Sequence, residues 1–223
     1  MARFRNREEA GQALADAVVA LDLPAPVVLA LPRGGVPVAA PVADRLGAAL
    51  DLVMVRKIGM PGNPELAAGA VVDGPAPYTH FNRGIMASAR LTEDDLAPTI
   101  AHELSVIAKR RAVYLQNRAP VALTGRDVVV VDDGIATGAT MRVALMAVRD
   151  QAPNSVTVAV PVGAPDTARD FARLADHVIC LLHPQPFFGV GQGYEDFGQT
   201  PDDEVVALLQ GRDGTGKPER DKG

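Results

Sequence analysis

The chain has 223 residues, of which 48% are hydrophobic and 22% charged, and it carries a formal net charge of −5. This length and composition are typical of a globular protein with a single domain and a sizeable core. The acidic balance disfavours a protein that coats nucleic acid, since such surfaces are strongly basic, although it leaves room for a local basic pocket.

The chain starts with MARFRNREEAG, which is basic but leads into no continuous apolar run, so we expect no signal peptide. No stretch approaches the roughly 18 uninterrupted apolar residues of a membrane span, and we expect a cytoplasmic protein with no membrane partner. The first helix is predicted over residues 7–21, because Ala10, Leu14 and Val18 recur at helical spacing and Asn6 is a suitable N-cap.

Two short apolar runs, VVLAL (27–31) and LVMV (52–55), predict buried strands. Between them, PRGG leads into a helix that ends at Leu46, with Gly47 in the position that follows the C-cap. The connection IGMPGNPE (58–65) is rich in glycine and proline and predicts a mobile loop.

Residues 70–90 predict short strands or a hairpin. A long helix follows, with Thr92 or Asp94 as its N-cap and with apolar rungs that recur at helical spacing. The remaining elements alternate between strands and helices: strand 128–131, helix 138–150, strand 156–160, helix 165–175 and strand 178–182. Apolar strands that alternate with amphipathic helices indicate an α/β fold with a doubly wound parallel sheet.

We expect one domain over residues 1–210, with a core at about 7–182 and a small C-terminal hood at about 183–200. The stretch 211–223 is polar, rich in glycine and free of aromatic residues, which predicts a flexible tail. Cys180 is the single cysteine, so no internal disulfide forms, and its apolar neighbours indicate a buried small side chain.

Ligands of doubly wound sheets bind at the carboxyl ends of the strands. Three predicted loops lie there: PRGG, RKIGMPGNPE and DDGIATGAT. In the last of these, Gly134 and Gly138 free the backbone to point several N–H groups at one anion, and a helix N-terminus follows. Thr137 and Thr140 add hydroxyl donors, so the loop predicts a cradle for a monophosphate. No Lys-Ser/Thr pair follows, which excludes a Walker loop.

Asp132 and Asp133 stand beside this cradle and would repel a phosphate. They suit vicinal hydroxyls, which donate hydrogen bonds, or a divalent cation. A ribose 5-phosphate offers both hydroxyls and a phosphate. The alternative is a pair of solvated aspartates in a turn, which the four preceding valines and the glycine loop disfavour.

The segment VVVVDDGIATGAT resembles the phosphoribosyl-pyrophosphate motif of the type I phosphoribosyltransferases. The resemblance implies that Asp132 and Asp133 hold the ribose 2- and 3-hydroxyls as catalytic residues. It also implies that the loop after them holds the 5-phosphate, through Ala136, Thr137, Gly138, Ala139 and Thr140. Ala139 replaces the glycine that is usual in the family.

PRGG resembles the family's pyrophosphate loop, in which Arg33 and the backbone of Gly34 and Gly35 contact the leaving group, often through a cis non-proline peptide. Considered from the residues alone, an arginine offers phosphate a forked donor and glycine permits close approach. The alternative is a tight turn with a surface arginine.

Arg56 and Lys57 stand where many members of the family begin a lid over pyrophosphate, and Glu65 is a candidate for the acid of that lid. A solvated basic pair and a carboxylate at a helix start are the alternatives.

The stretch FFGVGQGYEDF (187–197) has the spacing G-x-G-x-G, which is not that of a dinucleotide fingerprint. It is similar to the hood of hypoxanthine-guanine phosphoribosyltransferases, which implies that Phe188 stacks on a purine. Glu195 or Asp196 would then be the following acid, acting through Mg²⁺. Core packing of both phenylalanines is the alternative.

These resemblances imply a magnesium-dependent phosphoribosyltransferase that passes the phosphoribosyl group from phosphoribosyl pyrophosphate (PRPP) to a nitrogenous base, with a purine favoured. A regulator that senses PRPP or a nucleotide on the same fold is the alternative. A sugar-phosphate phosphatase or kinase is disfavoured, because the sequence shows no visible nucleophile, general base or triphosphate-binding loop. Dimers are common in the family, so a homodimer is an expected assembly, whereas a nucleic-acid partner is not expected.

Overall fold

The computed structural model describes residues 3–74, 77–116 and 118–212, with the side chains of Pro64 and Glu65 outside the described part. The described chain forms two compact units. The first runs up to Leu52 and resumes at Val121, and the second comprises Val53–Pro120. One domain over residues 1–210 stays a prediction, because compact units of a chain need not be separate domains. Most of the predicted tail, from residue 213 on, lies outside the described residues.

The first unit is built on a five-stranded parallel sheet with the strand order β2-β1-β6-β7-β8. Its strands are β1 (Pro26–Ala30), β2 (Ala49–Leu52), β6 (Asp127–Val131), β7 (Ser155–Val162) and β8 (His177–Leu182). The three central strands are rich in valine and buried almost throughout, as expected for strands that are covered on both faces.

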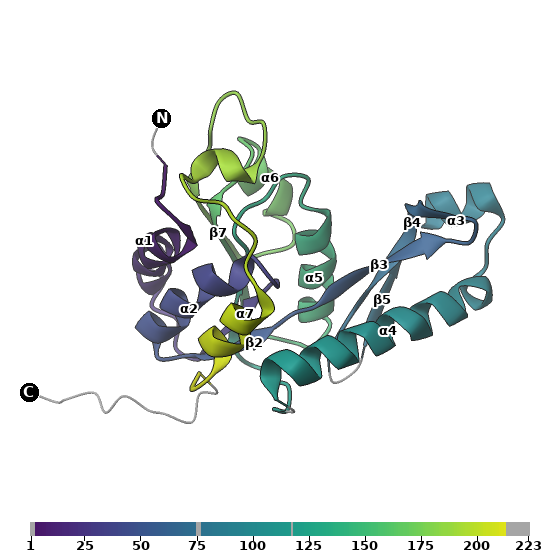
Figure 1. Cartoon of the computed structure of the whole chain (residues 1–223), viewed down its shortest axis with the longest axis horizontal. Helices are drawn as coiled ribbons and strands as arrows, with labels where there is room; N and C mark the ends of the chain where they lie inside the picture. The colour runs from purple at the N-terminus through teal and green to yellow at the C-terminus, as the bar shows by residue number, and fades with distance from the viewer. Residues whose placement is uncertain (1–2, 75–76, 117, 213–223) are drawn as a thin grey trace, which may run out of the picture. The chain divides into compact units, whose positions relative to one another are not determined.

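Helices cover both faces of this sheet: α1 (Arg7–Val19), α2 (Gly35–Leu46), α5 (Ala139–Arg149) and α6 (Thr167–Phe171). Helices α1 and α2 pack against each other on one side, and α5 lies on the other (Figure 1). From β1 the chain winds outward to β2, and from β6 it winds the opposite way to β7 and β8. The doubly wound sheet is therefore confirmed, and its switch point lies between β1 and β6.

Three elements of this unit differ from the predicted ones. The second strand is residues 49–52 rather than 52–55, because Asp51 interrupts the apolar pattern. Its buried carboxylate accepts hydrogen bonds from the N–H groups of Leu52 (2.7 Å) and Val121 (2.8 Å), so the strand tolerates it. Helix α6 is shorter than the predicted 165–175. Helix α7 (Asp202–Leu209) was not predicted and packs on α2.

The second unit is an antiparallel sheet of β3 (Val55–Met60), β4 (Asn63–Val72) and β5 (Tyr78–Phe81), with helices α3 (Arg83–Ala89) and α4 (Glu93–Leu115). Thr92 is the N-cap of α4, which packs on β3 and β4. The prediction of a mobile loop over IGMPGNPE is wrong. These residues form a hairpin that turns at Gly62 (φ +77°) and buries Ile58 completely.

Cys180 in β8 is half-buried rather than fully buried, and burial raises the pKa of its thiol to about 11. The group therefore stays protonated and unreactive near neutral pH. Among the described residues, no helix combines the length and apolarity that a bilayer crossing requires.

Candidate functional site

Two loops meet at the switch point of the parallel sheet. Ala30 at the end of β1 pairs with Val131 at the end of β6, and the Leu31 N–H donates to the Val131 carbonyl at 2.9 Å. The register of two neighbouring strands thus brings the PRGG loop against the acid pair. The sequence predicted both loops at the carboxyl edge of the sheet, and their contact follows from the pairing of β1 with β6.

The two glycines of PRGG are required by the closeness of this contact. A Cβ atom at Gly34 would lie 2.1 Å from the Asp133 Oδ2 atom, and one at Gly35 would lie 2.8 Å from the Val131 carbonyl oxygen. Any side chain at either position would force the loop away from the acids. The Pro32–Arg33 peptide in the same loop is cis, as the family resemblance implied.

Asp132 and Asp133 follow β6 directly, and both side chains are partly buried. The Asp133 N–H donates to the Asp132 Oδ1 atom at 2.8 Å. Burial raises the pKa of Asp132 well above its usual range, and the neighbouring charge of Asp133 adds to the rise. Burial also raises the pKa of Asp133, against the opposing charge of Arg7. The two acid side chains are therefore partly buried and close together, which is not the setting of a solvated turn.

Arg7 is a residue of this site that the sequence analysis missed. Its Nε and Nη2 atoms both lie 2.9 Å from the Asp133 Oδ2 atom. The residue was interpreted only as the start of the first helix. The sequence holds no signal for its role, because Asp133 is 126 positions away and Glu8 and Glu9 already place acids in the first turn of this helix.

The loop after the acids is fixed to the neighbouring strand and ends in a helix N-terminus. The Ile135 N–H donates to the Val162 carbonyl at the end of β7 (2.8 Å), and the Ile135 side chain is buried. Gly138 is the N-cap of α5 in a left-handed conformation (φ +71°) and offers no side chain to cap the helix. Ala136, Thr137, Ala139 and Thr140 around it are exposed. The arrangement leaves helix-terminal N–H groups open to an anion.

Residues 190–197 of the expected hood pack on the acid loop. The Tyr194 hydroxyl donates to the Asp133 carbonyl at 2.6 Å, and burial raises the pKa of this hydroxyl, so it remains a donor. A Cβ atom at Gly134 would lie 2.4 Å from the Val190 side chain, which shows how closely the two segments pack. Tyr194 belongs to the predicted hood motif but was assigned no role from the sequence.

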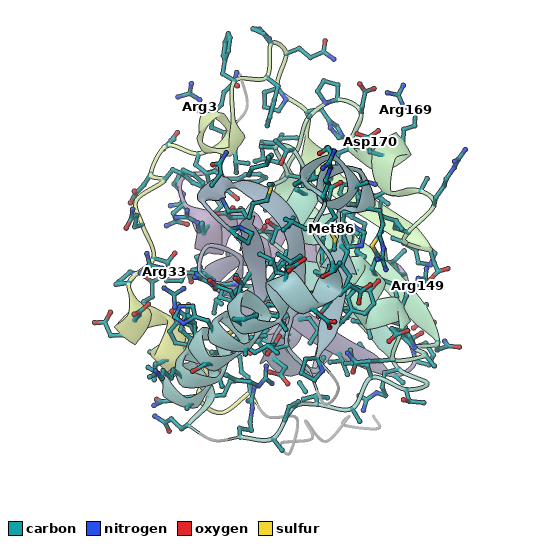
Figure 2. All side chains as sticks on the ribbon, turned by 90° about the vertical axis from the view of Figure 1, so that its right-hand side faces the viewer. Arg3, Arg33, Met86, Arg149, Arg169 and Asp170 are labelled. Atoms are coloured by element: carbon teal, nitrogen blue, oxygen red, sulfur yellow. The ribbon has the colours of Figure 1, made fainter. Side chains whose placement is uncertain are left out.

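Arg33 and Phe188 are two further predicted residues of this unit, and each reaches toward solvent. The Arg33 guanidinium lies 3.3 Å from the Asp202 carboxylate and 3.5 Å from the Gln199 side-chain oxygen, beside the C-terminal α7 (Figure 2). Such long contacts on a partly exposed side chain are weak, so an anion could replace them. Phe188 is 83% exposed, which contradicts the alternative that it packs in the core.

Glu195 and Asp196 are exposed, and Asp196 caps the N–H of Gly198 at 3.1 Å. Within the described ranges, no three His, Cys, Asp or Glu side chains gather as a metal cluster. Magnesium in phosphate-processing sites is commonly held by one or two carboxylates together with water and substrate phosphates. The exposed carboxylates of Glu195 and Asp196 have the oxygen ligands that a magnesium ion held in this way requires.

Arg56 and Lys57 were predicted at the end of a parallel strand. In the structure they lie instead within the antiparallel strand β3 of the second unit. The Arg56 Nε atom pairs with the Glu103 carboxylate of α4 at 2.7 Å, and Lys57 is exposed. Glu65 belongs to β4, but its side chain lies outside the described residues. The basic pair thus sits in the ladder of a hairpin.

The sequence matches the family model described as phosphoribosyl transferase domain over residues 6–196. Two proteins of Mycobacterium tuberculosis, from strains CDC 1551 / Oshkosh and ATCC 25618 / H37Rv, are each 44% identical over 209 residues, and both are named "Putative phosphoribosyl transferase". The match covers 94% of this chain and 47% of each relative, so the chain spans about half the length of these curated relatives. The crystal structure of TT1426 from Thermus thermophilus is 46% identical, with a TM-score of 0.79 over 93% of this chain and 97% of that one.

Proposed function

The chain belongs to the phosphoribosyl transferase domain family, and on this premise we propose that it transfers the 5-phosphoribosyl group of PRPP to a nitrogenous base and releases pyrophosphate. One observation carries the proposal. The acid pair lies within contact distance of a glycine loop on one side and continues into the N-terminus of helix α5 on the other. A phosphorylated pentose presents a diol and a phosphate that match these two features.

Asp132 and Asp133 would accept hydrogen bonds from the ribose 2- and 3-hydroxyls. A carboxylate is an acceptor at both oxygens, and charge-assisted hydrogen bonds of this kind are about twice as strong as neutral ones. The buried setting strengthens them further once the ligand has displaced water. The acids would thus fix the sugar ring and stabilise positive charge that develops at C1 as the pyrophosphate departs.

The loop from Ala136 to Thr140 would hold the 5-phosphate with backbone N–H groups and two threonine hydroxyls. The loop would be held rigidly, because the Ile135 N–H donates a hydrogen bond to the end of β7 and Gly138 packs close to the Phe171 ring. A rigid cradle places C1 of the sugar at a constant distance from the PRGG loop. Most of the rate acceleration would come from this positioning and from exclusion of water.

The leaving pyrophosphate would lie at Gly34 and Gly35, with Arg33 turning from its weak contacts to meet it. Arg56, Lys57 and Glu65 would belong to a covering segment, a role that rests on the family resemblance alone. Magnesium, when bound with the pyrophosphate, supplies neutralisation of the charge on the leaving group. The protein's own contribution is the arginine fork and the close approach of a backbone without side chains.

The acceptor base would stack on Phe188, and a purine is favoured for this position. The 83% exposure of this residue supports a role in binding, since a phenylalanine so far out of the core contributes little to stability. Glu195 or Asp196 would contact the base or a magnesium ion. A role in nucleotide salvage, a cytoplasmic location and a homodimeric assembly are further parts of the proposal, and they rest on the resemblance to the family.

The test is release of pyrophosphate from PRPP and Mg²⁺ across a panel of purine, pyrimidine and non-nucleobase amines. We expect turnover with at least one purine, and a loss of about 100-fold or more in Asp133→Asn, because one acceptor of the diol becomes partly a donor. Wild-type-like turnover in Asp133→Asn would overturn the role of the acid pair. Tight PRPP binding without turnover on the whole panel would favour a regulator that senses PRPP.

A further inference from the structure

Arg7 contacts three different parts of the site from the first turn of α1. Its Nε and Nη2 atoms lie 2.9 Å from the Asp133 Oδ2 atom, and its Nη1 atom donates to the Gly198 carbonyl at 2.7 Å. Its guanidinium carbon lies 4.1 Å from the centroid of the Phe197 ring. The Arg7 and Asp133 side chains are only 13% and 16% exposed. A guanidinium with this many fixed partners is held in one position.

The backbone before Arg7 is fixed to the same segment. The Phe4 N–H donates to the Gly193 carbonyl at 2.9 Å, and the Glu195 N–H donates to the Phe4 carbonyl at 2.8 Å. The chain therefore enters α1 along the hood, and the placement of Arg7 does not depend on its side chain alone.

The position of the two Arg7 nitrogens matters for the chemistry of Asp133. Both nitrogens bind the same carboxylate oxygen, Oδ2, so Oδ1 remains for a ligand. The charged and titratable groups that face this carboxylate are Arg7, the Asp132 carboxylate and the Tyr194 hydroxyl. Asp132 disfavours the charged form of its neighbour, and Arg7 favours it.

We propose that Arg7 is a positioning residue that holds the Oδ2 atom of Asp133 and so directs the Oδ1 atom of the same carboxyl group to the sugar diol. The proposal rests on the function proposed above. It adds that diol recognition depends on the N-terminal segment and the hood together, because Arg7 ties Asp133 to the Gly198 carbonyl and the Phe197 ring. Arg7 itself does not touch the sugar. It acts through the acid.

The experiment compares the wild-type protein with Arg7→Met, Arg7→Lys and a matched control, Arg45→Met. Arg45 also pairs with an aspartate, Asp16, at 3.1 Å, but both side chains are more than 60% exposed and lie outside the site. Two quantities are measured as a function of pH. The first is the ¹³Cγ chemical shift of Asp133 in the ligand-free protein, which reports its pKa. The second is the affinity for PRPP with Mg²⁺ by calorimetry.

We expect the pKa of Asp133 to be higher in Arg7→Met than in the wild type, intermediate in Arg7→Lys and unchanged in Arg45→Met. PRPP affinity near neutral pH should fall about 10- to 100-fold in Arg7→Met, the range that a hydrogen bond to a charged group contributes, and the deficit should shrink as the pH rises. Should Arg7→Met not fold, the Arg7→Lys titration decides by the same criterion.

A merely structural arginine would lower affinity equally at every pH and leave the pKa of Asp133 unchanged, and either result would overturn the proposal. The pKa of Asp133 could also rise in Arg7→Met while the wild-type protein binds no PRPP. This result would support the hold of Arg7 on the acid and refute the proposed function.

Discussion

Gly34→Ala is the substitution whose effect follows most directly from the geometry. The added Cβ atom would lie 2.1 Å from the Asp133 Oδ2 atom and 2.7 Å from its Cγ atom, whereas ordinary van der Waals contact begins near 3.4 Å. The carboxylate cannot retreat freely, because Arg7 holds the same oxygen through two nitrogens at 2.9 Å. The PRGG loop, the acid or both must therefore move by about 1 Å.

Two magnitudes follow from a displacement of this size. Overpacking of a close contact costs about 1–3 kcal/mol of stability, which lowers Tm by roughly 2–12 °C in a chain of this length. Misplacement of a reacting group by about 1 Å costs about 100-fold in rate. We therefore expect Gly34→Ala to stay folded and to lose PRPP affinity and pyrophosphate release much more than stability.

The assay is thermal unfolding together with pyrophosphate release, with Gly84→Ala as the matched control. Gly84 lies in the first turn of α3, where a Cβ atom meets nothing closer than 3.7 Å, so alanine should be neutral or stabilise by up to about 1 kcal/mol. Wild-type Tm and turnover in Gly34→Ala would refute the close approach of the loop to the acid.

Two further predictions concern charge. Asp132→Asn should raise Tm near neutral pH by a few degrees, because burial raises the pKa of Asp132 and its charged form is disfavoured in the folded state. The same substitution should weaken PRPP binding, because it removes a proposed acceptor of the diol. Wild-type stability should accordingly fall as the pH rises from the pKa of Asp132 in the unfolded chain to its raised pKa in the folded protein. An Asp132→Asn protein that melts at the wild-type temperature throughout this pH range would contradict this interpretation. Arg111→Met should cost about 3–5 kcal/mol in urea unfolding, because Arg111 pairs at 2.6 Å with Asp73, which is 8% exposed and also accepts the Met54 N–H. A loss below about 1 kcal/mol would show that the pair does not behave as a buried one.

Much of the parallel sheet could be predicted because its strands are continuous apolar runs. Val128–Val131 is buried on both faces, and such a run has few interpretations once turn residues bound it. Strand β2 was misplaced because Asp51 lies within it, and nothing in a single sequence shows that Leu52 and Val121 satisfy its carboxylate. A buried charge can be predicted only together with its partners.

The position of the acid pair and of the glycine-containing loop after it, at the carboxyl end of β6, could be predicted because the residues that form them are consecutive. Arg7 and Tyr194 could not, since they reach Asp133 across 126 and 61 positions of the chain. The hairpin of the second unit was mistaken for a loop because glycine and proline are common in both. The pairing of β3 with β4, in which Ile58 lies opposite Gly69, distinguishes a hairpin from a loop, and it depends on contacts between strands that residue preferences do not show.

The central claim is that one site holds a pentose by its diol and by its phosphate at the same time. Calorimetric titration of the protein with PRPP and Mg²⁺, and then with ribose 5-phosphate and inorganic phosphate alone, tests this claim most directly. We predict saturable binding of PRPP by the wild-type protein, weaker binding of each fragment, and a loss of PRPP affinity in Asp133→Asn that leaves the phosphate affinity unchanged. Absence of heat from PRPP, or equal PRPP affinity in the wild-type protein and in Asp133→Asn, would contradict the claim that one site holds the diol and the phosphate together.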